Sequence, residues 1–131
     1  MIFLDSGYFK GLMNYKDAHH NDSLKIQEYL NNSNETTVIN TTVLVETLNN
    51  TVKTNILAKD MFNVLYSQNQ IIQLTYEDYL KSLEVNMWYG NSINYGDCTI
   101  INTMINMSII DIVTFDSDFE KVNGFNIISS I

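Results

Sequence analysis

The stretch "IFLDSGYF" at residues 2–9 carries three apolar side chains straight into an acid, Asp5. Its length and composition predict a short buried strand over residues 1–5. Residues 6–15 have helical periodicity, and Ser6 is the expected N-cap because serine accepts hydrogen bonds from free helical N–H groups. A carboxylate at the end of a buried strand is costly unless a partner compensates its charge. The main question that the sequence raises is therefore what Asp5 faces.

Short apolar runs alternate with helical periodicity along the rest of the chain. Runs typical of strands lie at residues 36–40, 71–75, 109–115 and 125–129. Helical patterns lie at residues 22–30, 41–50, 56–68, 76–90 and 96–108. Strands separated by helices imply right-handed crossovers and a parallel sheet covered on both faces. We therefore predict an α/β fold, a single three-layer α/β/α domain over residues 1–131 with a parallel sheet of about four to five strands.

The same patterns predict helix caps and one apolar stripe. Asp22 is the expected cap of the second helix, and Thr41 or Thr42 is the expected cap of the third. In the helix over residues 76–90, five large apolar side chains fit the helical spacing well. They are Tyr76, Tyr79, Leu80, Leu83 and Met87.

The composition limits the class of protein. The chain has 131 residues, 45% of them hydrophobic, which is enough for one domain with a buried core. The formal charge of −8 argues against passive adhesion to nucleic acid, but a nucleic-acid enzyme whose acids hold cations stays compatible with it. No apolar run is long enough to cross a bilayer, and no secretory signal is expected. The single cysteine, Cys98, permits no intrachain disulfide, so a reducing cytoplasm is the expected compartment.

Acidic side chains follow the predicted strands at the ends where parallel sheets bind ligands. Asp5 ends the first strand, and Asp116 and Asp118 follow a later one. Glu46 and Asp97 lie early in two helices and reach the same edge only with suitable packing. Two carboxylates about 4 Å apart repel each other by roughly 4 kcal/mol at an effective dielectric near 20. Oxygen ligands suit Mg²⁺ or Mn²⁺, so we expect Asp5 to face a metal ion shared with the other acids.

Four segments carry a resemblance to a known family: "FLDSGYF" at residues 3–9, "TTVLVETLN" at 41–49, "NYGDCTIINTM" at 94–104 and "VTFDSDF" at 113–119. They resemble, in order and spacing, the acidic motifs of the PIN-domain family. Within that family the chain is most similar to the small VapC-type toxins of toxin–antitoxin pairs, over almost its whole length. The resemblance implies a PIN-like fold and metal-dependent endoribonuclease activity. It also implies an RNA substrate, a cognate antitoxin protein and a homodimer.

The resemblance assigns roles to individual residues. Catalytic roles are implied for four acids, Asp5, Glu46, Asp97 and Asp116. The three aspartates of this set would hold Mg²⁺ or Mn²⁺, and the ion would activate an attacking water. Glu46 would bind a second ion or orient that water. Ser6, Thr114 and the extra acid Asp118 would fix the direction of the carboxylates.

The basic residues limit how RNA can be held. All seven are lysines, so the chain has no planar guanidinium to grip a phosphate through two parallel hydrogen bonds. RNA contact must then use lysines, and Lys10 and Lys53 are expected to make it from their positions in the chain.

Other interpretations stay open. Asp5 would also serve as a helix cap, and Asp97 would be stabilised by the helix dipole without any metal. The chain would then be a catalytically inactive PIN-like domain that binds RNA or a protein. A haloacid-dehalogenase-like phosphatase fits worse, because Gly7 stands where its second aspartate belongs. A response-regulator receiver also fits worse, because Tyr76 follows the strand that should end in its phosphate-accepting aspartate.

Smaller features have simpler explanations than chemistry. His19 and His20 lie in a polar break and are expected to be solvated loop residues rather than metal ligands. Cys98 is expected to be a small buried thiol. Three aromatic side chains are expected to be core or dimer contacts rather than platforms for RNA bases: Trp88, Tyr89 and Tyr95.

Overall fold

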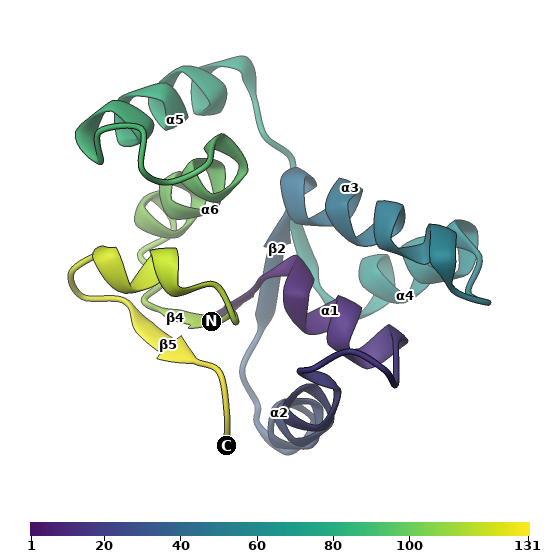
Figure 1. Cartoon of the computed structure of the whole chain (residues 1–131). Helices are drawn as coiled ribbons and strands as arrows, with labels where there is room; N and C mark the ends of the chain where they lie inside the picture. The colour runs from purple at the N-terminus through teal and green to yellow at the C-terminus, as the bar shows by residue number, and fades with distance from the viewer.

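A five-stranded parallel sheet forms the centre of the protein (Figure 1), whose computed structural model describes residues 1–131. The strands are β1 (Ile2–Leu4), β2 (Thr37–Asn40), β3 (Gln70–Ile72), β4 (Asp111–Val113) and β5 (Asn126–Ile128). They lie in the order β3-β2-β1-β4-β5, and every neighbouring pair is parallel. The predicted α/β fold with a parallel sheet is therefore confirmed.

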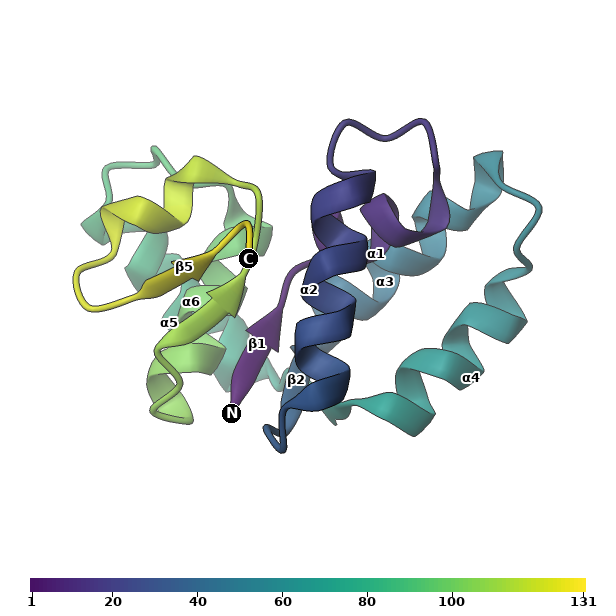
Figure 2. The same cartoon turned by 90° about the horizontal axis from the view of Figure 1, so that it is seen from below.

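Helices connect the strands and cover both faces of the sheet. They are α1 (Ser6–Met13), α2 (His20–Asn32), α3 (Thr41–Asn49), η1 (Asn50–Lys53), α4 (Ala58–Gln68), α5 (Tyr76–Trp88), α6 (Tyr95–Asn106) and η2 (Ser117–Lys121). Helices α1 to α4 lie on one side of the sheet, and α5 and α6 lie on the other (Figures 1 and 2). Right-handed crossovers require this division, because the chain moves outward through β2 and β3 and then returns past β1 to β4. None of the helices combines the length and the apolar character that crossing a membrane requires.

The central strands are buried on both faces, which explains why they are continuous apolar runs in the sequence. Phe3 of β1, Val38 of β2 and Ile112 of β4 have no exposed surface. Helix α6 closes the core from one side with Ile100 and Met104, which are also fully buried.

The strand order reverses beside β1. From β1 the chain moves through α1 and α2 to β2 on one side, while β4 pairs with β1 on the other side. In open α/β sheets, ligands bind in the crevice outside the carboxyl ends of two such strands. Asp5 follows β1 directly and Asp116 follows β4 closely, so the fold places both acids at this crevice.

Two helix caps differ from the sequence prediction. Asp5 caps α1, because its Oδ1 accepts a hydrogen bond of 2.8 Å from the Ser6 amide, and Ser6 is the first helical residue. Asn40 caps α3, because its Oδ1 accepts a hydrogen bond of 3.1 Å from the amide three residues on. The prediction of Thr41 or Thr42 for that cap is wrong. Asn40 is the last residue of β2 and Asp5 directly follows β1, so in both cases the cap lies at the point where the strand ends.

Two element boundaries also differ. Helix α2 begins at His20, whose Nδ1 lies 2.7 Å from the carbonyl oxygen of Gly11, so Asp22 lies in the first turn and is not its cap. Strand β3 ends before the predicted strand does, because Thr75 forms a reciprocal capping box with Asp78 at the start of α5.

The predicted helix is present as α5, but its apolar stripe lies at the surface. Its five members are exposed, from 41% for Tyr79 to 79% for Tyr76. Helix α5 packs mainly on α6, and Ser82 is the one fully buried side chain that it contributes. Helical spacing identifies an apolar stripe, but the layers of the fold decide whether another element covers it.

Gly11 of α1 lies against the start of α2 with no room for a side chain. A Cβ atom there would overlap Ser23 Oγ and lie 3.2 Å from the His19 carbonyl oxygen. We expect Gly11→Ala to lower the free energy of unfolding by about 1–3 kcal/mol, because overpacking forces the helices apart. Gly7→Ala is the matched control, since a Cβ there meets Phe115 Cδ2 at 3.6 Å, an ordinary contact. Urea unfolding compares the two variants, and equal stabilities would contradict the prediction.

Candidate active site

Asp5 lies between β1 and α1, at the switch point of the sheet where the strand order reverses, and its side chain is buried. Its Oδ1 accepts the capping hydrogen bond from the Ser6 amide, and its Oδ2 accepts one of 2.7 Å from Thr114 Oγ1. Burial raises the pKa of Asp5 to about 6, although the hydrogen bonds from Thr114 and Ser6 partly oppose the shift. The negative charges of Glu46 and Asp116 contribute to this rise. Uncharged partners therefore orient the carboxylate without neutralising it.

Thr114 joins the ends of the two central strands. Besides donating to Asp5, its buried hydroxyl accepts a hydrogen bond of 3.0 Å from the Asp116 amide. The Oδ1 atom of Asp116 in turn accepts one of 2.9 Å from the Asp118 amide and caps η2. One hydroxyl thus positions Asp5 and the turn that carries Asp116.

Glu46 reaches the same place from α3. Its Oε2 accepts a hydrogen bond of 3.0 Å from Ser6 Oγ. Its Oε1 lies beside the first turn of α6, 3.5 Å from where a Cβ atom on Gly96 would be. The hydroxyls of Thr42 and Thr99, 2.8 Å apart, hold α3 against α6. Glu46 therefore lies between the starts of two helices, whose partial positive charge stabilises a carboxylate.

Asp97 lies in the first turn of α6 and is buried. Asn94 caps this helix, because its Oδ1 accepts a hydrogen bond of 2.9 Å from the Asp97 amide. The Oδ2 atom of Asp97 is buried and has no hydrogen-bond partner. One carboxylate oxygen from each of Asp97, Asp116 and Asp118 lies within 4.8 Å of the other two.

Lysines leave this acidic cluster almost uncompensated. Of the three ion pairs in the structure, one reaches it: Lys121 Nζ lies 2.8 Å from Asp118 Oδ1. No lysine pairs with the four predicted catalytic acids, Asp5, Glu46, Asp97 and Asp116. The folded protein therefore gathers more negative charge here than its own cations neutralise.

Asp97 shows what this crowding does. Burial raises its pKa, and the adjoining carboxyl of Asp116 raises it further, together with the charges of Asp5 and Glu46. A buried carboxylate oxygen without a partner, among other acids, fits a hard divalent cation that takes oxygen ligands. Mg²⁺ and Mn²⁺ suit this set of donors. The three carboxylates that lie close enough to share such an ion are those of Asp97, Asp116 and Asp118. Asp5 lies near enough for its charge to raise the pKa of Asp97, but it is not one of these three.

Two residues at the site differ from what the sequence suggested. Asp118, for which the resemblance implied a supporting role, is one of the three acids that have carboxylate oxygens within 4.8 Å of one another. Asn94, which fixes the start of α6, was not among the predicted site residues. Its signal in the sequence is an asparagine three positions before an aspartate, a pattern typical of helix starts.

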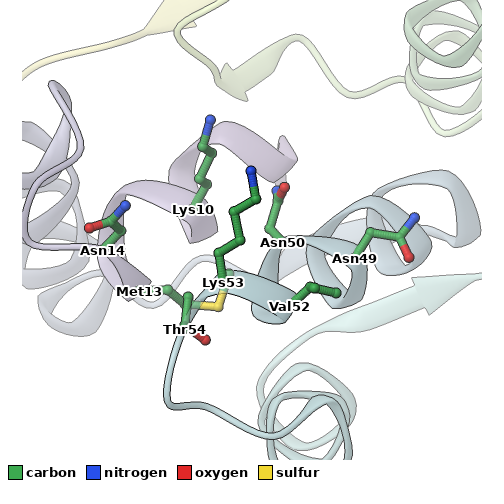
Figure 3. A pocket seen from close by; sticks show the side chains of 8 residues that line it. All are labelled: Lys10, Met13, Asn14, Asn49, Asn50, Val52, Lys53 and Thr54. Carbon is green, nitrogen blue, oxygen red and sulfur yellow. The ribbon is translucent and has the colours of Figure 1, made fainter.

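The two lysines expected to contact RNA line one cavity. Lys10 and Lys53 lie on its rim, between the end of α1 and the segment formed by α3 and η1 (Figure 3). The cavity has a volume of about 260 Å³. Lys10 and Lys53, which were chosen from their positions in the sequence, therefore line the same cavity in the structure.

The other candidates lie outside the acidic cluster or take no part in it. His19 is exposed in the turn before α2, as expected, but its ring also stacks on Phe115 with centroids 4.1 Å apart. His20 begins α2 and is not a loop residue. Cys98 is fully buried, as expected. Trp88 is 83% exposed, so it is not a core residue, and its role as a dimer contact stays a prediction.

The raised pKa of Asp5 predicts how stability depends on pH without metal. Burial raises this pKa from 3.8 to about 6, so between these values the folded protein binds more protons than the unfolded chain. The stability is fully present below this window and falls as the pH rises through it, by about 3 kcal/mol for Asp5 alone. Asp97, whose pKa is also raised, extends the loss to higher pH.

Urea unfolding in EDTA at about pH 5 and about pH 8 measures this effect. We expect a lower free energy of unfolding at the higher pH, and recovery there when Mn²⁺ is added, because an ion that binds the folded state stabilises it. Asp97→Asn should reduce the difference between the two pH values. A metal-free stability that is flat or rises over this range would contradict the account.

Comparison with known proteins identifies the family. Among solved structures, the fold is similar to that of VapC20 of Mycobacterium tuberculosis, a toxin that cleaves the sarcin–ricin loop. The two sequences are 18% identical, the TM-score is 0.77, and the match covers 95% of this chain and 96% of that chain. VapBC2 of Rickettsia felis, bound to a DNA fragment from its promoter, is similar at 19% identity with a TM-score of 0.70, over 97% of each chain. At these identities the likeness shows a shared fold. A search of curated proteins gave no match. The sequence profile of the PIN domain matches residues 2–124, nearly the whole chain, and the protein therefore belongs to the PIN domain family.

Proposed function

We propose that this protein is a metal-dependent endoribonuclease that hydrolyses phosphodiester bonds of RNA. The observation that carries the proposal is the cluster of uncompensated carboxylates at the switch point of a PIN-family sheet. A site built only to stabilise the fold would pair such acids with lysines or leave them at the surface, because buried unpaired charge is costly. The membership of the PIN family and the fold shared with VapC20 support RNA as the substrate.

Three aspartates would hold Mg²⁺ or Mn²⁺, directly or through water: Asp5, Asp97 and Asp116. When bound, such an ion stabilises negative charge on a phosphoryl oxygen and lowers the pKa of an attacking water. Glu46 orients that water or helps to hold a second ion, and Ser6 fixes its carboxylate by a hydrogen bond. The reaction is direct hydrolysis and requires no covalent nucleophile.

Asp118 has a supporting role in this scheme. Its carboxylate lies near Asp97 and Asp116, but its ion pair with Lys121 already compensates part of its charge. It would adjust the position of the turn that carries Asp116 and hold water at the edge of the site. This is the role that the resemblance to the PIN-domain family implies for it.

The proposal extends to the biological setting. The shared fold with VapC20 and with VapBC2 supports a toxin of a toxin–antitoxin pair, acting on RNA in the cytoplasm, with a cognate antitoxin. A homodimer is proposed as well. Large exposed apolar side chains on α5, such as Leu83, Met87 and Trp88, support a surface that other proteins cover.

Substitution of the acids tests the enzymatic proposal. Asp97→Asn and Asp116→Asn should abolish cleavage of a labelled RNA in Mg²⁺ or Mn²⁺, because each removes a carboxylate that would hold the ion. Their stability without metal should be equal to that of the wild type or higher, since repulsion is relieved. Asp60→Asn, on the exposed start of α4, removes the same charge elsewhere and should cleave normally.

Calorimetric titration with each ion separates the two interpretations of the acids. The enzyme should bind Mg²⁺ or Mn²⁺ saturably, and Asp97→Asn should weaken that binding. A wild-type protein that binds neither ion at millimolar concentration and cleaves no RNA would instead be an inactive PIN-like domain.

Thr114→Val tests the positioning hydroxyl at nearly constant volume. It removes the hydrogen bond from Thr114 to Asp5, which orients the carboxylate and opposes the rise of its pKa. It also leaves the Asp116 amide without its acceptor. We expect cation affinity to fall by about 10–100-fold and the rise of cleavage with pH to move to higher pH. Thr114→Ser keeps the hydroxyl and should restore both properties. Unchanged cation affinity in Thr114→Val would show that the hydroxyl only packs.

A further inference from the structure

A polar cavity lies beside the acidic cluster and takes no part in it. Two lysines and three asparagines line most of it, with a threonine and two apolar side chains: Lys10, Met13, Asn14, Asn49, Asn50, Val52, Lys53 and Thr54. Figure 3 shows the ammonium groups of Lys10 and Lys53 pointing to the same side of the cavity, from two different segments of the chain. Its volume of about 260 Å³ is below the range of pockets for drug-sized ligands, so it has room for one small unit.

The cavity lies next to the acidic site, further along the contact between α1 and α3. Helices α1 and α3 follow neighbouring parallel strands, start at the same edge of the sheet and pack against each other (Figure 1). Lys10 lies four positions after Ser6, and Asn50 lies four positions after Glu46. Side chains at this spacing share one face of a helix and are about 6 Å apart along its axis. Because Ser6 and Glu46 contact each other, the cavity begins about one helical turn from the candidate catalytic acids.

The charge of the cavity is opposite to that of the site. The protein has a net charge of −8, yet no acidic side chain lines this cavity. Neither Lys10 nor Lys53 forms an ion pair or a side-chain hydrogen bond. Each lies in the last turn of a helix, where the dipole favours a cation, and this explains one lysine at each helix end. It does not explain why both free ammonium groups share a cavity with three carboxamides.

These groups match the parts of a nucleotide. Ammonium groups bind a phosphate as point charges. Carboxamides donate and accept hydrogen bonds, and asparagine can pair with the edge of a base. The side chains of Met13 and Val52 offer an apolar surface to a ribose or base. A cavity of this size between two helices accepts one nucleotide of a single strand and is too small for a duplex.

We propose that this cavity binds one nucleotide of single-stranded RNA beside the bond that is cleaved, with Lys10 and Lys53 on its phosphate and the asparagines on its sugar or base. This inference rests on the proposed nuclease function. The acids bind the cleaved phosphate through cations, and this cavity binds a neighbouring unit without one. It thereby holds the strand in register and offers the chain its own means of selecting a base.

Charge-neutralising variants test the cavity. Lys10→Gln/Lys53→Gln removes both cations from it, and Lys25→Gln/Lys59→Gln removes two exposed lysines that lie elsewhere, on α2 and α4. Binding of a fluorescein-labelled single-stranded RNA is measured by anisotropy over a range of salt, with Ca²⁺ in place of Mg²⁺. We expect about tenfold weaker binding for the cavity variant, and a salt slope that is shallower by about 0.7 for each lost phosphate contact. The control pair should stay within about twofold of the wild type.

Two further measurements complete the test. Asn50→Ala keeps the charge, so it should weaken RNA binding and leave the salt slope unchanged. In cleavage assays, the lysine variant should raise KM by about the same factor as it weakens binding, with kcat changed much less.

The outcomes separate this inference from the nuclease proposal. If RNA is cleaved but the cavity variant and the control pair behave alike, the cavity has no such role while the nuclease proposal stands. If no protein cleaves RNA but the cavity variant alone loses binding, the nuclease proposal fails and the RNA-binding cavity stands. A wild type that binds no single-stranded RNA in Ca²⁺ would overturn the inference.

Discussion

The whole carboxyl edge of this sheet depends on one constraint, which is that buried and half-buried acids meet beyond the ends of β1 and β4. Asp5 and Asp116 come there from positions just after β1 and β4, Asp97 comes from the first turn of α6, and Glu46 comes from the second half of α3. The protein supplies hydroxyls, amides and helix N-termini to direct these acids, but almost no counter-charge. Such an arrangement is stable only because the rest of the fold holds it, and it favours any cation that the oxygens can bind.

The energetic consequence links stability to function. Ionising Asp5 in the folded state opposes burial and two neighbouring carboxylates, as its raised pKa shows. The hydrogen bond from Thr114 reduces that cost, and the same bond fixes the direction of the carboxylate. Features that make the apo protein less stable at neutral pH thus prepare the site for a divalent ion. Strain of this kind is common at functional sites, where the surrounding core tolerates it.

Much of the fold could be predicted because strands and helices alternate with clear boundaries. Buried apolar runs predicted the parallel sheet, and acids at strand ends predicted where Asp5 and Asp116 lie. The sequence could not show that α5 packs mainly on α6 and leaves its apolar stripe exposed. It also could not show that Asn94 fixes Asp97, or how close Asp118 lies, because those are consequences of tertiary packing. The cavity at Lys10 and Lys53 depends on the register of α1 against α3, which only coordinates reveal.

Acids and lysines have separate roles along the contact between α1 and α3. The acids at one end of this contact would bind cations, and the lysines further along would bind the RNA strand. The central claim is that the acidic cluster binds a divalent cation. Anomalous diffraction from crystals grown with Mn²⁺ tests it most directly. The account predicts an anomalous peak within coordination distance of carboxylate oxygens of Asp97 and Asp116. A crevice without a peak at millimolar Mn²⁺, or a peak only at surface acids elsewhere, would contradict it.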